Sequence, residues 1–252
     1  MSYIFHLFFY NPLYNGLIIF LSYLPHPDVG LAVILFTIFI KLTLFPLSKQ
    51  AVRTQMEIKE IEPDLAKIKE KFKDNREQQA KETMALYKRR GINPFSSFFL
   101  ILIQVPIIFA LYFIFFKGGL PSIDTSLLYG FVNNLSLKTI PDMHFLGLFD
   151  VSKPQIILGA LAGISQFIQV QFSIPPVKKV ENPNFKDDLA RSMNIQMRYI
   201  LPVFIFLISL QLSGAVTLYW ITGNLFTIAQ EMYMRKIIKK ERGVPTALTS
   251  KA

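Results

Sequence analysis

The sequence predicts an all-α integral membrane protein built around a bundle of five transmembrane helices. Hydrophobic residues make up 52% of the 252 positions, 24 of them Phe, and the mean hydropathy is +0.37. Several uncharged runs reach the roughly 20 residues that a helix needs to cross the hydrocarbon core. Lys and Arg gather between and after these runs, which is typical of the cytoplasmic loops of membrane proteins.

The N-terminal segment, residues 1–28, is apolar but interrupted by Asn11, Pro12 and Asn15. We expect a helix from Pro12 to Leu24 that is amphipathic and lies in the interface on the extracytoplasmic side. The alternative is a true span. The turn sequence Pro25-His-Pro-Asp28 then separates this segment from transmembrane helix 1, residues 29–48.

Residues 49–92 are polar and predict a cytoplasmic helical hairpin. A turn is expected at Asp74-Asn75, and Gly91 suits the C-terminal cap of the second helix. Apolar residues recur at spacings of three and four, as in a paired amphipathic helix. The first helix carries Ile58, Ile61, Leu65, Ile68 and Phe72 on this stripe, and the second carries Ala80, Met84 and Tyr87.

The rest of the chain divides into four further spans. Tyr199–Gln230 is uncharged over 32 residues, about 48 Å as one helix and too long for a single crossing, so Ser213-Gly214 is the expected break. The predicted segments are transmembrane helix 2 (93–116), an extracytoplasmic loop (117–153), transmembrane helix 3 (154–174), a cytoplasmic loop (175–194), transmembrane helices 4 (195–212) and 5 (213–234), and a basic cytoplasmic tail (235–252).

Charge distribution predicts the orientation. The hairpin holds 12 Lys/Arg, the loop at 175–194 holds 4 and the tail holds 6, whereas the opposite side holds only Lys117, Lys138 and Lys153. The positive-inside rule therefore places the N-terminus outside and the C-terminus in the cytoplasm.

Composition also argues against several function classes. The net charge of +10 follows from the cytoplasmic segments, so DNA is not an expected partner. There is no Cys, and the three His show no metal-ligand spacing. No His, Cys or carboxylate cluster falls inside the bundle, so we expect neither an enzyme nor a metal or cofactor site.

Lys41 is the most informative residue, because it lies inside an apolar run. A charge there costs about 2.5–3.5 kcal/mol on insertion scales. Thr37 and Ser48 share its helical face, and this polar stripe favours a wet cavity within the bundle. The alternative is a lysine whose ammonium extends to the headgroups.

Two other spans carry uncharged polar residues with similar alternatives. Gln104 lies in the middle of transmembrane helix 2, with Ser97 on its face, and either lines the cavity or hydrogen-bonds a neighbouring helix. Gln166, Gln169 and Ser173 share one face of transmembrane helix 3, with the same two interpretations.

The last span has the clearest polar face. Thr217, Trp220, Asn224, Thr227 and Glu231 follow one another at spacings of three and four. We expect Thr217, Trp220 and Asn224 to line the same cavity as Lys41. An interfacial anchor is the alternative for Trp220, and simple solvation is the alternative for Glu231.

Taken in order, these segments resemble the YidC family of membrane-protein insertases, which has mitochondrial and chloroplast relatives. The likeness runs from about Asn11 to Met234. It is carried by Ile40-Lys-Leu-Thr-Leu-Phe-Pro-Leu47, Gly91-Ile-Asn-Pro94, Ile103-Gln-Val-Pro106, Gln196-Met-Arg-Tyr-Ile-Leu-Pro202 and Leu218-Tyr-Trp220 with Asn224. Together with the charged hairpin after the first span, the set is specific.

The resemblance implies a five-helix bundle with a hydrophilic groove, open to the cytoplasm and the lipid and closed on the outer side. It implies a bacterial plasma-membrane protein that receives nascent membrane proteins in the groove and releases them laterally, alone or with the Sec translocon. The implied groove residues are Lys41, Thr37, Gln104, Trp220, Asn224, Thr217, Gln166 and Gln169. Membrane lipids are implied as partners too, and no cofactor is.

Three departures from the family pattern qualify these expectations. Most bacterial members have arginine where this chain has Lys41, and lysine lacks the bidentate fork of arginine. The short tail weakens the expectation of ribosome binding, and neither a lipobox cysteine nor a large extracytoplasmic domain is present near the start. Two alternative functions are open. One is a small transporter or channel, but the chain shows no internal repeat and no acidic residues at span centres. The other is a structural assembly factor for the translocon.

Overall fold

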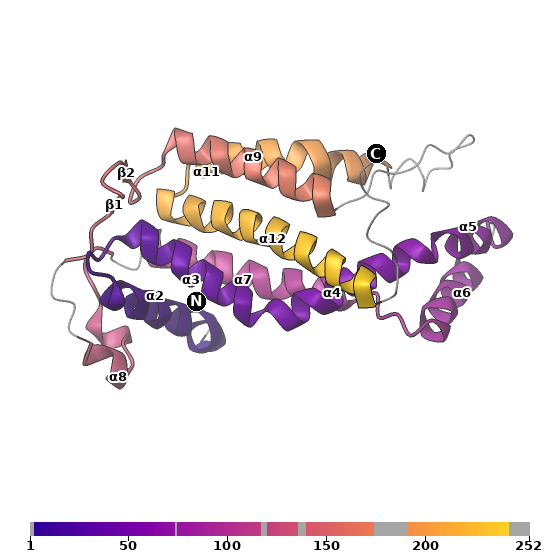
Figure 1. Ribbon diagram of the computed structural model, residues 1–252, viewed down its shortest axis with the longest axis horizontal. Helices are drawn as coiled ribbons and strands as arrows, with labels where there is room; N and C mark the ends of the chain where they lie inside the picture. Colours follow the sequence, from indigo (N-terminus) through magenta and orange to yellow (C-terminus); the bar gives the residue numbers. More distant parts are fainter. Residues whose placement is uncertain (1–2, 74, 117–119, 136–139, 174–190, 242–252) are drawn as a thin grey trace. The chain divides into compact units, whose positions relative to one another are not determined.

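A computed structural model describes residues 3–73, 75–116, 120–135, 140–173 and 191–241. Their helices and strands are α1 (Tyr3–Phe5), the π-helical turn η1 (His6–Tyr10), α2 (Asn11–Tyr23), α3 (Val29–Thr43), α4 (Phe45–Glu60), α5 (Glu62–Lys71), α6 (Arg76–Arg89), α7 (Ser96–Phe116), η2 (Thr125–Leu127), α8 (Gly130–Asn133), β1 (His144–Phe145), β2 (Phe149–Asp150), α9 (Ile156–Ser173), η3 (Gln196–Ile200), α11 (Leu201–Ser209) and α12 (Gly214–Glu241). Figure 1 shows their course along the chain.

The helices agree with an all-α membrane protein. Three of them are long and apolar enough to cross a bilayer, namely Tyr3–Tyr23, Ile156–Ser173 and Arg191–Ser209. Val29–Thr43 and Phe45–Glu60 add a fourth candidate if they are counted as one broken span, and Leu102–Phe116 is a shorter apolar helix. The full set of five spans stays a prediction.

The N-terminal helix begins earlier than the sequence predicts. We expected Pro12 to start it, but the helix runs from Tyr3 to Tyr23 and is itself a candidate span. The π-helical turn η1 immediately precedes Asn11, whose backbone N–H donates to the His6 carbonyl. A widened turn accommodates the missing N–H of Pro12, so the proline does not end the helix.

The chain divides into two compact units, of which the first comprises Met1–Leu42 and Val105–Gln230. In this unit α9 packs along α11, and Figure 1 shows α12 beside this pair. Gly163 makes the close approach possible, since a Cβ there would lie 3.1 Å from the Phe206 Cβ and 3.2 Å from the Pro202 carbonyl oxygen. Gly159 and Gly163 form a small-xxx-small pattern, which favours tight helix pairs in membranes.

Backbone and side-chain bonds join α2 and α3 to the connection between α7 and α9. Asn15, which is 1% exposed, donates to the Leu127 carbonyl (2.9 Å) and accepts from the Tyr129 N–H (2.7 Å). Asp28 caps α3 by accepting from the Leu31 N–H and also accepts from the Leu146 N–H. These bonds satisfy buried polar groups at one end of the unit.

A short β-hairpin, which the sequence analysis did not predict, lies in the same connection. His144 pairs with Asp150 and Phe145 with Phe149, in antiparallel register. Its turn includes Gly147, whose φ of +70° favours glycine. The Phe145 ring packs directly on Gly30 of α3, where a Cβ would lie 2.6 Å from the ring, so the hairpin rests on the start of that helix.

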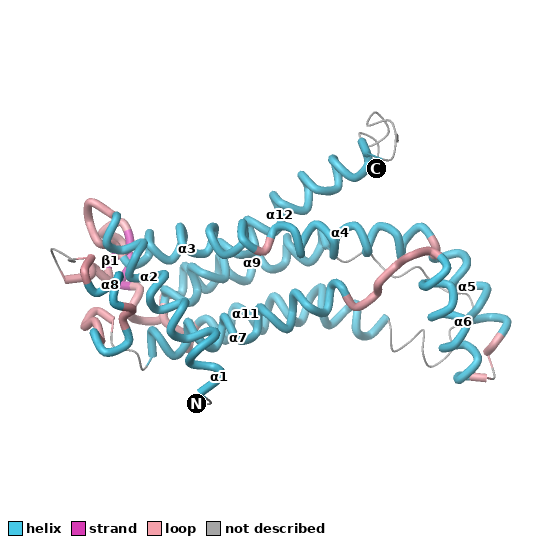
Figure 2. Tube along the Cα trace, turned by 90° about the horizontal axis from the view of Figure 1, so that it is seen from below, coloured by secondary structure: helices cyan, strands magenta, loops and turns pink. Residues whose placement is uncertain are grey.

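The second unit comprises Thr43–Gln104 and Glu231–Ala252. Here α5 and α6 lie side by side (Figure 2) and enclose an apolar cluster. Its buried members are Ile61, Leu86 and Ile92, with Ile58, Leu65, Ile68 and Tyr87 packed around them. Five residues of the predicted stripe thus lie in the cluster, but Ala80 and Met84 are exposed and Leu86 takes their place.

The end of α6 shows the predicted glycine cap. Gly91 has a φ of +67°, and the N–H groups of Gly91 and Ile92 bond the carbonyls of Lys88 and Tyr87. This is a Schellman motif, in which a left-handed glycine satisfies the last carbonyls of a helix. The prediction at Gly91 is confirmed.

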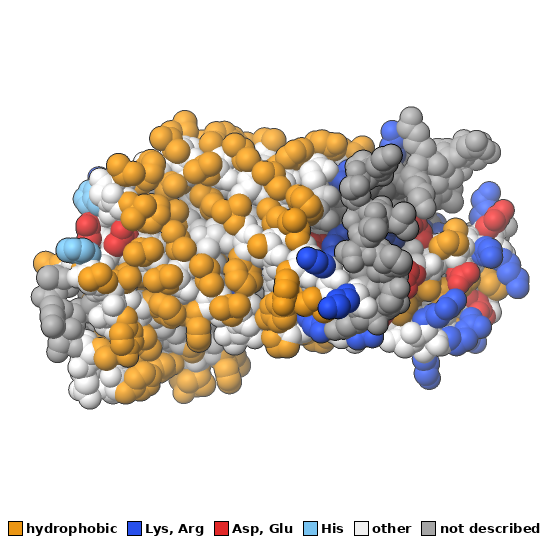
Figure 3. All heavy atoms as spheres, in the orientation of Figure 1, with side chains coloured by type: hydrophobic (Ala, Val, Ile, Leu, Met, Phe, Trp, Pro, Cys, Tyr) orange, Lys and Arg blue, Asp and Glu red, His pale blue; other side chains and the backbone are white. Residues whose placement is uncertain are grey.

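Surface composition differs between the two units. Hydrophobic side chains cover most of the visible face of the first unit in Figure 3, whereas Lys, Arg, Asp and Glu side chains cover α5 and α6. On α9 the exposed apolar residues are Ile156, Ile157, Leu161, Ile164, Phe167, Ile168 and Phe172. An apolar face of this kind is typical of helices in contact with lipid.

Candidate functional site

Lys41 makes a hydrogen bond to the last helix. Its side chain is half-buried on α3, and Nζ donates to Thr227 Oγ1 of α12 over 3.2 Å. The Thr227 hydroxyl in turn donates to the Gly223 carbonyl over 2.7 Å. The ammonium therefore has a polar acceptor although its own helix is largely apolar, which offsets part of the cost of placing a charge there.

Gly223 leaves room for the lysine side chain. A Cβ at this position would lie 3.5 Å from Lys41 Cε and 3.9 Å from Lys41 Nζ, and no other atom is nearer. The aliphatic end of the lysine thus rests against the backbone of α12. Residues 223 and 227 lie one helical turn apart, so the Gly223 backbone and the Thr227 hydroxyl both face the Lys41 side chain.

A second polar contact joins α9 to α12. Asn224, 8% exposed, donates from Nδ2 to Ser165 Oγ over 3.1 Å. One turn earlier, Trp220 donates from Nε1 to Gln166 Oε1 over 3.0 Å. Both alternatives that the sequence left for Gln166 remain compatible with this bond, because a residue that joins two helices can also border a cavity.

The polar chain continues along α9. Gln166 Nε2 donates to Gln169 Oε1 over 3.2 Å, and Gln169 Nε2 donates to Ser173 Oγ over 2.9 Å. These residues lie on one face because their spacings are three and four. Linked amides of this kind hold one another in fixed orientations.

Two predicted groove residues bond within their own helices. The Thr37 hydroxyl donates to the Val33 carbonyl over 2.6 Å, and the Thr217 hydroxyl donates to the Ser213 carbonyl over 3.2 Å. Both residues are at most 1% exposed. Their hydroxyl protons are thus taken up locally, and a role for either residue in the groove stays a prediction.

The structure brings most of the predicted residues to one helix and its neighbours. Trp220 and Asn224 contact α9, while Thr227, on the same face of α12, contacts Lys41 of α3. Gln104 belongs to the second unit and is half-buried, so its place beside Lys41 stays a prediction.

Sequence reasoning missed two members of these contacts. Ser165 is buried and accepts from Asn224, but a serine in a span carries no signal that distinguishes it from packing. Arg235 pairs with Glu231 in the second unit, and its Nε donates to Glu231 Oε1 over 3.1 Å. The spacing of four residues could have indicated this ion pair. Glu231 is 4% exposed, so simple solvation is the wrong description.

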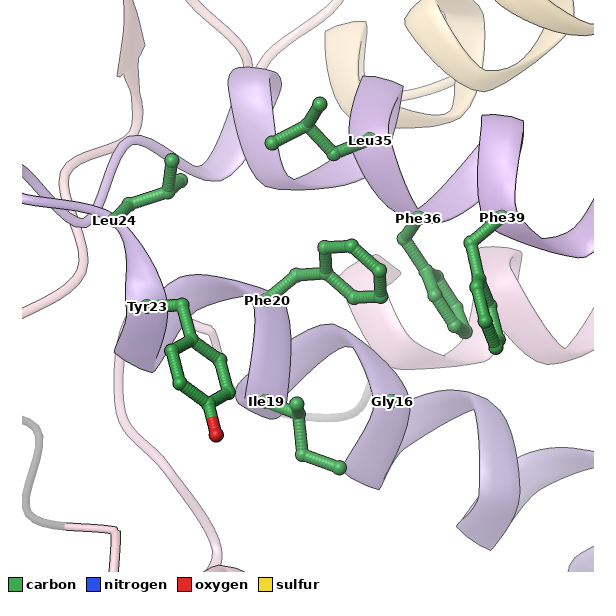
Figure 4. A pocket seen from close by; sticks show the side chains of 8 residues that line it. All are labelled: Gly16, Ile19, Phe20, Tyr23, Leu24, Leu35, Phe36 and Phe39. Atoms are coloured by element: carbon green, nitrogen blue, oxygen red, sulfur yellow. The ribbon is translucent and has the colours of Figure 1, made fainter.

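An apolar pocket of about 520 Å³ lies between α2 and α3 (Figure 4). It is lined by Gly16, Ile19, Phe20, Tyr23, Leu24, Leu35, Phe36 and Phe39. Figure 4 shows the Phe20 ring reaching toward Phe36 and Phe39, and each pair of ring centroids is 5.7 Å apart. The pocket holds none of the residues singled out from the sequence.

The described part of the chain contains no group of three or more His, Asp or Glu residues placed to hold a metal ion. Lys41, Trp220 and Asn224 offer hydrogen-bond donors and a positive charge, and such groups can receive a polar or acidic segment.

Comparison with known proteins gives a consistent result. The sequence profile of the family described as "60Kd inner membrane protein" matches residues 20–241. Membrane protein insertase YidC of Clostridium tetani is 33% identical over 216 residues, which are 86% of each chain. Membrane protein insertase MisCA of Bacillus subtilis is 30% identical over 227 residues, covering 88% of this chain and 76% of that relative. Membrane protein insertase YidC 1 of Halalkalibacterium halodurans is 30% identical over 232 residues, covering 90% and 77%.

Proposed function

Because the chain belongs to the 60Kd inner membrane protein family, together with the YidC insertases, we propose that it inserts nascent membrane proteins into the bacterial plasma membrane. The observation that carries the mechanism is the Lys41 ammonium, which belongs to the largely apolar helix α3 and bonds Thr227. A charge kept in such a place, despite its cost, is by default functional.

The physical problem is the polar tail that precedes or follows an apolar segment. Moving a charge and unpaired backbone through about 30 Å of hydrocarbon is prohibitive. A water-containing groove that displays the Lys41 ammonium, the Asn224 and Gln166 amides and the Trp220 indole N–H shortens the dry path. Thr37, Gln104, Thr217 and Gln169 complete the proposed lining.

Lys41 attracts acidic residues in the tail. Water in the groove screens this attraction, so binding stays weak enough for release. The apolar segment then leaves along the lipid-facing surfaces of the third and fifth spans. The exposed apolar side chains of α9 support this exit, because they present no polar barrier to a segment moving into lipid.

The energy source is partitioning of the apolar segment into lipid, aided by the membrane potential that acts on the charged tail. No covalent step is required. With the N-terminus outside and the C-terminus in the cytoplasm, the groove opens toward the cytoplasm, and the hairpin at 49–92 is the first contact for substrate, Sec translocon or ribosome. The arginines and lysines on α5 and α6 support this placement.

Reconstitution tests the proposal. Purified protein in liposomes should insert a test substrate with one apolar segment and a short acidic tail, measured by protease protection of the tail. Liposomes without the protein are the control. A photo-crosslinker placed at Gln166 or Trp220 should bind the stalled substrate, whereas one at the exposed Phe131 of α8, outside both the groove and the hairpin, serves as a comparison.

Two results would contradict the proposal. Insertion at the same rate in empty liposomes would show that the protein is not needed. Selective ion or solute flux through the protein, without insertion, would favour the small transporter or channel instead.

A further inference from the structure

Thr227 can only accept, not donate, toward Lys41. A threonine hydroxyl has a single proton, and this proton is directed at the Gly223 carbonyl, 2.7 Å away. The oxygen lone pairs that remain face the Lys41 ammonium at 3.2 Å. Two hydrogen bonds therefore run in the same direction, from the lysine to the threonine and from the threonine to the carbonyl. Each bond in such a chain polarises and strengthens the next.

Position 223 determines how close the lysine can lie to α12. With glycine there, the end of the lysine side chain lies against the helix backbone, because a Cβ would already be in contact with Lys41 Cε at 3.5 Å. A branched side chain would extend further into the same space. Lys41 has four rotatable bonds and a large conformational freedom to lose, so contact with the helix on one side and a hydroxyl at the tip restricts it.

We propose that Thr227, together with the bare backbone at Gly223, is a positioning device that holds the Lys41 ammonium against α12. An ammonium has three N–H donors, and the bond to Thr227 uses one, which leaves capacity for a carboxylate of a passing acidic tail. The proposal rests on the insertase function above and adds a residue that determines preference for acidic tails. Thr227 acts through Lys41 and does not itself bind the substrate.

The test uses the full chain in liposomes and two substrates that differ only in the tail, which carries Asp and Glu in one and Asn and Gln in the other. The readout is the ratio of acidic-tail to neutral-tail insertion. Thr227→Val removes the hydroxyl at nearly constant volume, and Thr227→Ser is the matched variant that keeps it. Both are also made in a Lys41→Gln background.

Thr227→Val should lower the ratio by roughly two- to tenfold, the effect of one ordinary hydrogen bond. Thr227→Ser should restore the ratio. In the Lys41→Gln background Thr227→Val should cause no further fall, because the residue acts only through the lysine. If Thr227→Val cannot be purified as a folded protein, Gly223→Val, which displaces the lysine and leaves the hydroxyl in place, should lower the ratio more than Gly223→Ala.

Two outcomes overturn the inference while leaving the insertase function intact: an unchanged ratio in Thr227→Val, which an equal loss with both tails would also give, or a further fall of the ratio in the Lys41→Gln background. Failure of Thr227→Ser to restore the ratio would also overturn it. If the unmodified protein inserts neither substrate above the level of empty liposomes, the proposed function itself fails, and the inference fails with it.

Discussion

Replacing Asn15 by Ala should destabilise the protein far more than its position in a helix suggests. The side chain is 1% exposed, and it satisfies the Leu127 carbonyl and the Tyr129 N–H, which are more than 100 residues away in sequence. An unsatisfied buried backbone group costs about 1–3 kcal/mol. Loss of both bonds should therefore lower the free energy of unfolding by about 2–6 kcal/mol.

The assay is thermal unfolding in a mild detergent, followed by circular dichroism. For a chain of this size, each kcal/mol shifts Tm by about 2–4 °C, so Asn15→Ala should lower Tm by roughly 4–24 °C. Asn133→Ala, at an exposed position, is the control and should have little effect. Equal Tm values for the two variants would refute the claim that Asn15 joins α2 to the connection between α7 and α9.

Two further predictions concern packing and pH. Gly163→Leu should lower the free energy of unfolding by about 1–3 kcal/mol, because even a Cβ is crowded at 3.1 Å by α11; a variant as stable as the parent would show that α9 and α11 can separate freely. The Asp142 pKa lies below its ordinary value of 3.8, chiefly because the backbone N–H of His144 donates to its carboxylate. A lowered pKa stabilises the fold above the unfolded value, and this contribution is lost as the pH falls through the folded value. Tm of the parent should therefore fall more steeply below pH 4 than Tm of Asp142→Asn, and identical slopes would count against the bond.

Local patterns predicted the parts of the fold that depend on neighbouring residues. Gly91 was expected to cap α6, and it adopts a φ of +67° because only glycine tolerates that conformation easily. The gap between α11 and α12 falls at the Ser213-Gly214 position where the uncharged run was too long for one crossing. In both cases the physical cause lies within a few residues of the feature.

Features that depend on distant partners were not predictable in the same way. Pro12 was expected to start a helix, yet the preceding π-helical turn lets the helix run on from Tyr3. In the sequence Asn15 interrupts an apolar run, but its hydrogen-bond partners lie in the connection between α7 and α9. A polar residue that is satisfied by tertiary contacts has the same sequence pattern as one that breaks a helix.

The candidate site falls between these cases. The spacing of Trp220, Asn224 and Thr227 indicated one polar face, and all three do bond residues of neighbouring helices. Their specific partners could not be read from the spacing, because helix pairing depends on packing across the whole unit. The Gly159-x-x-x-Gly163 pattern was present in the sequence and could have indicated the α9–α11 pair.

The central claim is that the positive charge of Lys41 promotes insertion of segments with acidic tails. The most direct test compares Lys41→Arg with Lys41→Glu for insertion of one acidic-tailed substrate, in cells depleted of their own insertase and in liposomes. Lys41→Arg should retain insertion, because it keeps the charge, and Lys41→Glu should reduce it about tenfold or more, a change of about 1.4 kcal/mol. Equal insertion by the two variants would contradict the account and remove the charge from the mechanism.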